Sequence, residues 1–184
     1  ILDEAAAARA RLTDYVDESF DISVNLTNAS LQWDGLVEAV ENSVKTHGIF
    51  CSQLCLEITE QDAISSTEDV VHKIEELKAH GHRFLIDDFG MGHTSLLYLQ
   101  TGFFAVVKLD GSLTRNVLEN ETNAEIIGSI TKLGESIHFT TIAEWVESKE
   151  QLEKLKALGC DVFQGAYYSR AIGYEDLVEW LISY

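Results

Sequence analysis

Short apolar runs alternate with longer amphipathic stretches along the whole chain. The apolar runs predict strands at residues 21–26, 53–58, 83–88, 104–109, 139–144 and 161–165. The amphipathic stretches predict helices at residues 2–19, 33–47, 67–80, 95–101, 123–137, 149–158 and 174–182. A strand followed by a helix, repeated six times, indicates βα units and a parallel sheet of the α/β class. Such a sheet is either open and doubly wound or closed into a barrel.

Each predicted strand ends in polar residues after an apolar body. These residues are Asn25, Glu57, Asp87 with Asp88, Lys108 with Asp110, Glu144 and Gln164. If the strand faces that carry them point to a common axis, the polar tips meet at the carboxyl mouth of a barrel, where barrel enzymes hold their catalytic groups. A single polar residue at a strand end usually only begins a solvated loop. A set of acids with one lysine favours a shared site.

The chemistry of this set indicates hard divalent cations. Carboxylates and amide oxygens suit Mg²⁺ or Mn²⁺ better than zinc. If a strand ends at Asp87, the next residue leaves the pleat, and Asp88 can turn toward the same mouth. One aspartate can then bridge two ions while the other binds only the second. Paired ions are a known device for hydrolysing phosphate esters.

The sequence allows three roles for Lys108. A buried lysine at a barrel mouth can be a Schiff-base nucleophile, as in a lyase. It can instead neutralise a carboxylate-rich site and position a water or a phosphate oxygen. It can also extend its ammonium group to solvent. Because four acids are expected nearby, the second role is favoured.

Charge and composition narrow the partners. The chain has 13 Lys and Arg against 31 Asp and Glu, a formal net charge of −18. Polymeric nucleic acid is therefore an unfavourable partner, whereas a small phosphorylated substrate can bind where metal ions reverse the local field. No apolar run has the length of a membrane span. The three cysteines, Cys51, Cys55 and Cys160, are too few and too scattered for a disulfide framework or a zinc site, which favours buried thiols in a cytoplasmic protein.

Six separated motifs together resemble one family. They are "SVNLT", "LEITE", "IDDFGMGHTSLLYL", "VKLDGS", "IAEWVE" and "LGCDVFQG", spread over about residues 20 to 172. In this order they are similar to the EAL-domain cyclic di-GMP phosphodiesterases. The resemblance implies a TIM-like (β/α) barrel and metal-dependent hydrolysis of cyclic di-GMP to linear pGpG, using Mg²⁺ or Mn²⁺, with two ions expected. It also implies a cytoplasmic signalling protein, a homodimer, and a GGDEF or sensory domain fused outside this chain.

The resemblance also implies a role for each site residue. Asn25, Glu57, Asp87, Asp88 and Glu144 match metal ligands, and Lys108 and Glu144 match the catalytic pair beside the attacking water. Gln164, Glu60, Glu147, Asp110 and Gly90 match substrate-binding or supporting positions. Glu60 would hold the loop at 89–95, which would couple ligand binding, metal occupancy and dimerisation, with Gly90 and Gly92 giving it backbone freedom. The plainer reading of Glu60 and Glu147 is a solvated loop acid and a helix N-terminal acid.

The sequence departs from the family in three respects. The glutamate and arginine of the name-giving motif have no equivalent in residues 1–184, and only six strands are predicted where a complete barrel has eight. Residues 1–184 are therefore expected to be a single EAL-like domain that is incomplete at its N-terminus, or a degenerate member that binds cyclic di-GMP or a protein partner without hydrolysis. Trp145 stands where the family commonly has glycine, and His93–Thr94 replace a commoner Tyr–Ser.

Overall fold

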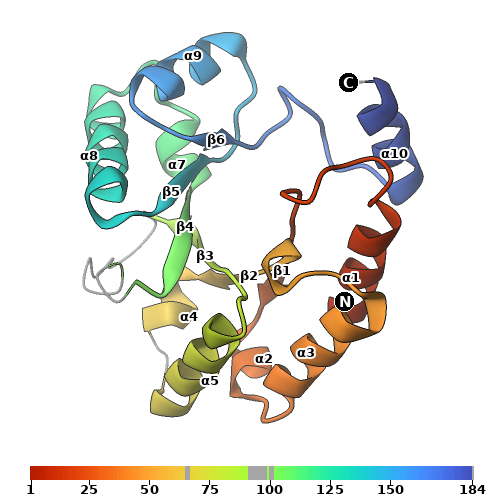
Figure 1. The fold of residues 1–184 in the computed structure, drawn as a ribbon. Coiled ribbons are helices and arrows are strands. Elements are labelled where there is room, and N and C mark those ends of the chain that lie inside the picture. The colour runs from red at the N-terminus through yellow and green to blue at the C-terminus, as the bar shows by residue number, and fades with distance from the viewer. Residues whose placement is uncertain (65–66, 91–98, 100–101, 184) are drawn as a thin grey trace. The chain divides into compact units, whose positions relative to one another are not determined.

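The computed structural model describes residues 1–64, 67–90, 99 and 102–183. Figure 1 shows helices and strands that alternate along the chain, as the hydrophobic pattern predicts. The chain divides into two compact units. Unit 1 comprises Ile1–Ile58, Ser66–Phe84 and Ala171–Tyr184, and unit 2 comprises Thr59–Ser65 and Leu85–Arg170.

Unit 1 is built on two parallel strands. β1 (Ile22–Leu26) pairs with β2 (Leu54–Thr59), in a register that runs from Ile22 opposite Leu54 to Leu26 opposite Ile58. The Leu56 backbone N–H donates to the Arg83 carbonyl, one residue before β3 (Phe84–Phe89). The helices of this unit are α1 (Leu2–Arg11), α2 (Asn28–Gln32), α3 (Leu36–His47), α5 (Glu68–Ala79) and α10 (Tyr174–Ser183), with a 3-10 turn, η1, at Cys51–Gln53.

The helices of unit 1 begin and end where local chemistry dictates. The Thr67 hydroxyl accepts a hydrogen bond from the Val70 N–H and caps α5. α3 ends at Gly48, whose φ of 65° is in the left-handed region that glycine adopts without steric cost. Both helices bury an apolar face at helical spacing, through Val40 and Val44 in α3 and Val70, Ile74 and Leu77 in α5.

Unit 2 continues the same architecture. Its strands β3, β4 (Phe104–Leu109), β5 (Thr140–Ala143) and β6 (Val162–Phe163) neighbour one another in sequence order. The β4–β5 and β5–β6 pairs are parallel, with Lys108 opposite Ile142 and Ala143 opposite Phe163. The helices are α4 (Glu60–Ile64), α7 (Gly111–Thr114), α8 (Glu121–Ile137) and α9 (Lys149–Ala157). All six predicted strands are present, so the predicted α/β class is confirmed.

Several predicted boundaries are wrong for local reasons. The helix predicted at 2–19 ends at Arg11, because the following turn folds back and the Arg9 side chain binds its carbonyls. The helix predicted at 33–47 starts at Leu36, and Trp33 is extended between α2 and α3. The strand predicted at 139–144 ends at Ala143, and Trp145 has a positive φ. The helix predicted at 95–101 and the loop beyond Gly90, including Gly92 and His93–Thr94, lie outside the described residues apart from Leu99. No described helix has the length and hydrophobicity of a membrane span.

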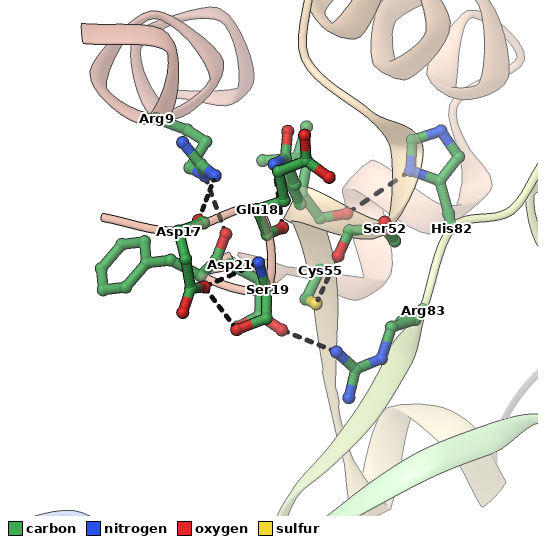
Figure 2. Close-up of polar contacts among 12 residues, drawn as sticks. Arg9, Asp17, Glu18, Ser19, Asp21, Ser52, Cys55, His82 and Arg83 are labelled. Carbon is green, nitrogen blue, oxygen red and sulfur yellow. Dashed lines mark hydrogen bonds and ion pairs between the residues drawn. The ribbon is translucent and has the colours of Figure 1, made fainter. Parts of the chain in front are cut away.

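The buried Arg9 side chain links α1 to the segment that leads into β1 (Figure 2). Its Nε donates to the Phe20 carbonyl at 2.7 Å and its Nη2 donates to the Asp17 carbonyl at 3.0 Å. The side chain is 2% exposed, so removing the guanidinium takes a buried donor from both carbonyls and leaves the Asp17 carbonyl with the Phe20 N–H at 3.3 Å.

Arg9→Met is therefore expected to lower the free energy of unfolding by about 3 kcal/mol, measured by urea denaturation. Arg11→Met is the matched control. Arg11 is exposed and stacks on the Tyr174 ring, so its loss is expected to cost less than about 1 kcal/mol. Equal costs for the two variants would contradict the structural role given to Arg9.

Candidate active site

Lys108 lies between two carboxylates at one edge of the sheet in unit 2. Its Nζ is 3.0 Å from Asp87 Oδ1 and 2.8 Å from Glu144 Oε1. The three side chains are 7%, 17% and 12% exposed for Lys108, Asp87 and Glu144. Charges that are this poorly hydrated are held together by their mutual attraction, because each one alone would be costly to bury.

Neighbouring strands place these three side chains at the same edge of the sheet. Asp87 is in β3, Lys108 is in β4, and Glu144 directly follows β5. The backbone ladder continues past the assigned strands, because the Glu144 N–H donates to the Leu109 carbonyl at 3.4 Å. Likewise the Asp110 N–H donates to the Phe89 carbonyl at 3.2 Å. Glu144 is thus held in strand-like register although it lies outside β5.

Asp88 joins this group through its backbone conformation. β3 continues to Phe89, one residue beyond the strand predicted at 83–88, and Asp88 has a φ of 56°. Aspartate tolerates this left-handed region better than most residues. The result is that one carboxylate oxygen each from Asp87, Asp88 and Glu144 lie within 4.8 Å of one another.

The donor set fits a hard divalent cation. All three ligand candidates are carboxylates, the chemistry that Mg²⁺ and Mn²⁺ prefer. Asp87 Oδ1 is fully buried and accepts no hydrogen bond from any residue that the structure describes, so its contact with Lys108 is purely an ion pair. A buried carboxylate oxygen without a hydrogen-bond donor has coordination capacity left for a cation.

The cluster also changes the ionisation of Asp88. Loss of hydration raises the pKa of the Asp88 carboxyl above its ordinary 3.8, the negative charges of Asp87 and Asp110 add to the rise, and Lys108 opposes it. The folded state therefore binds protons more tightly than the unfolded state. Without a cation, the free energy of unfolding should fall as the pH rises above 3.8.

Asp88→Asn removes this group while keeping a residue that tolerates positive φ. In metal-free buffer the free energy of unfolding of Asp88→Asn, relative to that of the wild type, should increase as the pH rises above 3.8. Urea denaturation at several pH values measures this difference. If the free energies of unfolding of the two proteins changed with pH in the same way, the pKa of Asp88 would not be raised in the folded state.

Glu60 supports the backbone that follows the paired aspartates. Its Oε2 accepts a hydrogen bond from the Gly90 N–H at 3.1 Å, and the side chain is buried rather than solvated. Gly90 has a φ of 104°, and an added Cβ would lie 2.7 Å from the Leu113 Cδ1 atom. Only glycine fits this turn, so Glu60 and Gly90 form a fixed link at the end of β3.

Asn25 and Glu57 form a separate pair in unit 1. They are neighbours in the parallel register of β1 and β2, both close to the carboxyl ends of their strands. Glu57 is 7% exposed, whereas Asn25 is exposed. An amide and a carboxylate side by side in register are compatible with the ligand roles that the sequence suggests, which stay predictions.

The remaining predicted residues have mainly structural contacts. The Asp110 carboxylate accepts from the Ser112 N–H at 2.7 Å and caps α7. Glu147 is exposed just before the Ser148 cap of α9, which matches the plainer reading of a helix N-terminal acid. Gln164 is exposed after β6, and its N–H donates to the Ala143 carbonyl at 2.9 Å. Their roles with a substrate stay predictions.

Trp145 directly follows Glu144 and takes a backbone conformation that usually favours glycine. Its φ is 56°, in the left-handed region. The indole lies over Gly111, where an added Cβ would overlap the Trp145 Cδ1 atom. The Arg115 guanidinium lies over the ring, 3.6 Å from its centroid. Sequence reasoning misses this stacking partner, because no local spacing connects residues 30 positions apart.

Gly111→Ala should disturb the Trp145 ring and cost about 1–3 kcal/mol of stability. In a Trp145→Gly background the same substitution should be nearly neutral, because the ring that it meets is gone. Urea denaturation of the four proteins of this double-mutant cycle measures the coupling. An equal cost in both backgrounds would contradict the contact.

Comparisons with known proteins agree with this architecture. The chain is 33% identical over 178 residues to the bifunctional diguanylate cyclase/cyclic di-GMP phosphodiesterase MucR of Pseudomonas aeruginosa, covering 97% of this chain and 26% of MucR. It superposes on a structure of PaMucR phosphodiesterase in complex with c-di-GMP with a TM-score of 0.89 and 34% identity, covering 96% of this chain and 71% of that one. It superposes on Klebsiella pneumoniae BlrP1 in a manganese and cy-diGMP complex with a TM-score of 0.82 and 28% identity, covering 92% and 43%.

The similarity identifies the fold and the family, although the chain spans only about a quarter of the length of MucR. The TM-scores confirm the predicted TIM-like barrel class, with six strands among the residues that the structure describes. The EAL domain profile matches residues 1–171. The chain therefore belongs to the EAL domain family.

Proposed function

We propose that this chain hydrolyses one phosphodiester bond of cyclic di-GMP, giving linear pGpG, with the help of Mg²⁺ or Mn²⁺. The observation that carries the proposal is the convergence of Asp87, Asp88 and Glu144 around Lys108 in a member of the EAL family. Support comes from relatives that are named cyclic di-GMP phosphodiesterases and from a similar structure that holds manganese and cyclic di-GMP.

Asp87, Asp88 and Glu144 would hold the cation, and Asn25 and Glu57 are proposed as further ligands. Two ions are expected in all. When bound, the cation supplies positive charge to the scissile phosphate and lowers the pKa of a nearby water. The carboxylates set where that positive charge lies, because they are fixed by strand backbone.

The contacts of Lys108 and Glu144 support different roles for them in the proton chemistry. Lys108 contacts two carboxylates, so its ammonium form is the one that this environment favours. An ammonium group cannot accept a proton, and we therefore propose Lys108 as the group that orients the attacking water and the phosphate oxygens. Glu144 is then the proton acceptor. The same contacts disfavour a Schiff-base lyase, which needs a free amine at Lys108.

The supporting residues complete the proposal. Glu60 would fix the turn at Gly90 and thereby the carboxylates before it. Gln164, Glu147 and Asp110 are proposed to bind substrate or to steady the ligands. A homodimer, a fused GGDEF or sensory domain and a cytoplasmic location are further proposals that follow from the family alone.

A second function is a sensor that binds cyclic di-GMP without cleaving it. One observation favours it: Lys108 already balances charge between Asp87 and Glu144 before any cation binds. A lysine that neutralises the acidic cluster reduces the electrostatic stabilisation that a bound metal ion would add, compared with a cluster of carboxylates alone.

Turnover and binding assays separate the two functions. The protein is incubated with cyclic di-GMP and Mn²⁺, with Mg²⁺, or with a chelator, and the products are separated by chromatography. Formation of pGpG only when a divalent cation is present supports the phosphodiesterase. Tight binding by calorimetry without product supports the sensor, and neither binding nor product would overturn both.

A further inference from the structure

A second cluster of metal-ligand side chains lies in unit 1, near the amino ends of β2 and β3. Glu41 comes from α3, Cys51 begins η1 ahead of β2, and His80 and His82 lie between α5 and β3. Within this unit, Asn25 and Glu57 lie at the opposite, carboxyl ends of β1 and β2. The cluster is therefore separate from the candidate active-site residues.

The two histidines of this cluster contact the same carboxylate oxygen. Glu41 Oε1 is 3.0 Å from His82 Nε2 and 3.0 Å from His80 Nδ1. One ligand atom each from Glu41, Cys51 and His82 lie within 4.8 Å of one another. In a tetrahedral zinc site, ligand atoms lie about 3–4 Å apart, as the usual metal–ligand distances of about 2.0–2.3 Å require. Glu41, Cys51 and His82 are therefore already near that spacing, and His80 joins them through its contact with the same Glu41 oxygen.

His82 is oriented as a metal-binding histidine. Its side chain is 0% exposed, and Nδ1 faces the Leu54 carbonyl at 3.4 Å (Figure 2). A carbonyl oxygen only accepts, so Nδ1 donates to it, and Nε2, which faces the Glu41 carboxylate, is the nitrogen that binds a metal once it gives up its proton. Metal-bound histidines are typically held in this way by a backbone carbonyl behind the ring.

The turn between the two histidines brings Cys51 to them. Gly81 has a φ of 102°, and the His82 N–H donates to the Leu77 carbonyl at 3.0 Å, which closes the end of α5. A Cβ built on Gly81 would lie 3.7 Å from the Cys51 Cβ, an ordinary packing distance. The segments that carry the thiol and the two imidazoles are therefore packed against each other.

An acidic cleft gives access to the cluster. It has a volume of about 620 Å³, and Glu41 and His80 form part of its wall. Four further acids also line this cleft, and they are Asp34, Glu38, Asp69 and Glu76. Such a surface concentrates cations, although Lys73 offsets part of its charge.

We propose that Glu41, Cys51, His80 and His82 bind a zinc ion that ties α3, η1 and the turn before β3 together. Imidazole and thiolate ligands select zinc over the Mg²⁺ or Mn²⁺ that all-carboxylate sites prefer. The site is structural, since all four ligands come from the protein. It does not depend on the proposed hydrolysis of cyclic di-GMP.

Cobalt substitution reads out this site directly, because a thiolate ligand gives Co²⁺ an intense charge-transfer band in the near ultraviolet. Metal-free protein titrated with Co²⁺ should show this band, and Zn²⁺ should displace it. The carboxylates near Lys108 hold no sulfur and cannot produce it. Cys51→Ser should abolish the band, and His80→Gln should weaken Zn²⁺ binding by at least about 100-fold. His80 is 44% exposed, so this second variant should fold normally.

His72→Gln is the matched control. His72 lines the same cleft, but its ring faces Glu75 at 3.4 Å. This variant should keep the band and the affinity of the wild type. Zn²⁺ should also raise the melting temperature of the wild type and of His72→Gln but not of Cys51→Ser. No sulfur band in the wild type, or the same Zn²⁺ affinity in the wild type and His80→Gln, would overturn the proposal and leave Glu41 and the two histidines as an ion-pair network.

Discussion

Asp87→Asn is expected to lower the rate of cyclic di-GMP hydrolysis by about 1,000-fold or more. Asp87 offers a buried oxygen that no described hydrogen-bond donor satisfies, and it contacts the Lys108 ammonium as well. Asparagine keeps the shape but loses the charge that holds both a divalent cation and Lys108. Initial rates at saturating Mn²⁺ measure the effect.

The matched control for this substitution is Asp14→Asn. Asp14 is exposed in the turn after α1, so its replacement should leave the rate within about two-fold of the wild type. Calorimetric titration with Mn²⁺ in the absence of nucleotide should show weaker binding to Asp87→Asn only. If Asp87→Asn hydrolysed cyclic di-GMP at the wild-type rate, the carboxylate cluster would have no part in catalysis.

Lys108→Met is expected to destabilise the metal-free protein by about 3 kcal/mol, because it leaves two poorly hydrated carboxylates facing each other. Asp87 and Glu144 both lie within 3.0 Å of the Lys108 Nζ that this change removes. A divalent cation can replace the missing charge, so Mn²⁺ should raise the melting temperature of Lys108→Met more than that of the wild type. Hydrolysis should still fall by about 100-fold or more, since methionine cannot orient a water or a phosphate.

Lys149→Met provides the comparison for Lys108. Lys149 is 69% exposed and lies 3.8 Å from Glu153, a surface pair that contributes little to stability. Its replacement should change neither the melting temperature nor the effect of Mn²⁺. If Mn²⁺ stabilised Lys108→Met no more than the wild type, the cation and the lysine would not share a site.

The sequence predicts the strands well because their cause is local. Apolar runs such as 104–109 are buried along most of their length, and polar residues follow them where the strand ends. The placing of polar groups at strand ends is also a local signal. It locates Asp87, Lys108 and Glu144 at one edge as soon as the sheet is known to be parallel.

Other features depend on contacts between distant segments and have no local signal. α1 ends at Arg11 because the Arg9 guanidinium binds carbonyls of the following turn. The stacking of Arg115 on Trp145 requires both the turn after β5 and the start of α7. The left-handed conformation of Asp88 is favoured by its residue type, but the residue type alone does not distinguish it from Asp87.

The histidines show the same limit. Their spacing in the sequence suggests no shared ligand face, and the cysteines are too scattered for a zinc site. The fold nevertheless brings Glu41, Cys51 and His82 together, because α3, η1 and the approach to β3 are neighbours in unit 1. Tertiary contact, rather than spacing, creates this cluster.

Anomalous X-ray scattering from crystals of the protein soaked with Mn²⁺ locates the bound cation directly. We expect a manganese peak within coordination distance of carboxylate oxygens from Asp87, Asp88 and Glu144. Crystals of Asp87→Asn treated in the same way should lack the peak or show it much weakened. Wild-type crystals with no manganese at these three carboxylates, under conditions where cyclic di-GMP is hydrolysed, would show that the cation does not bind there.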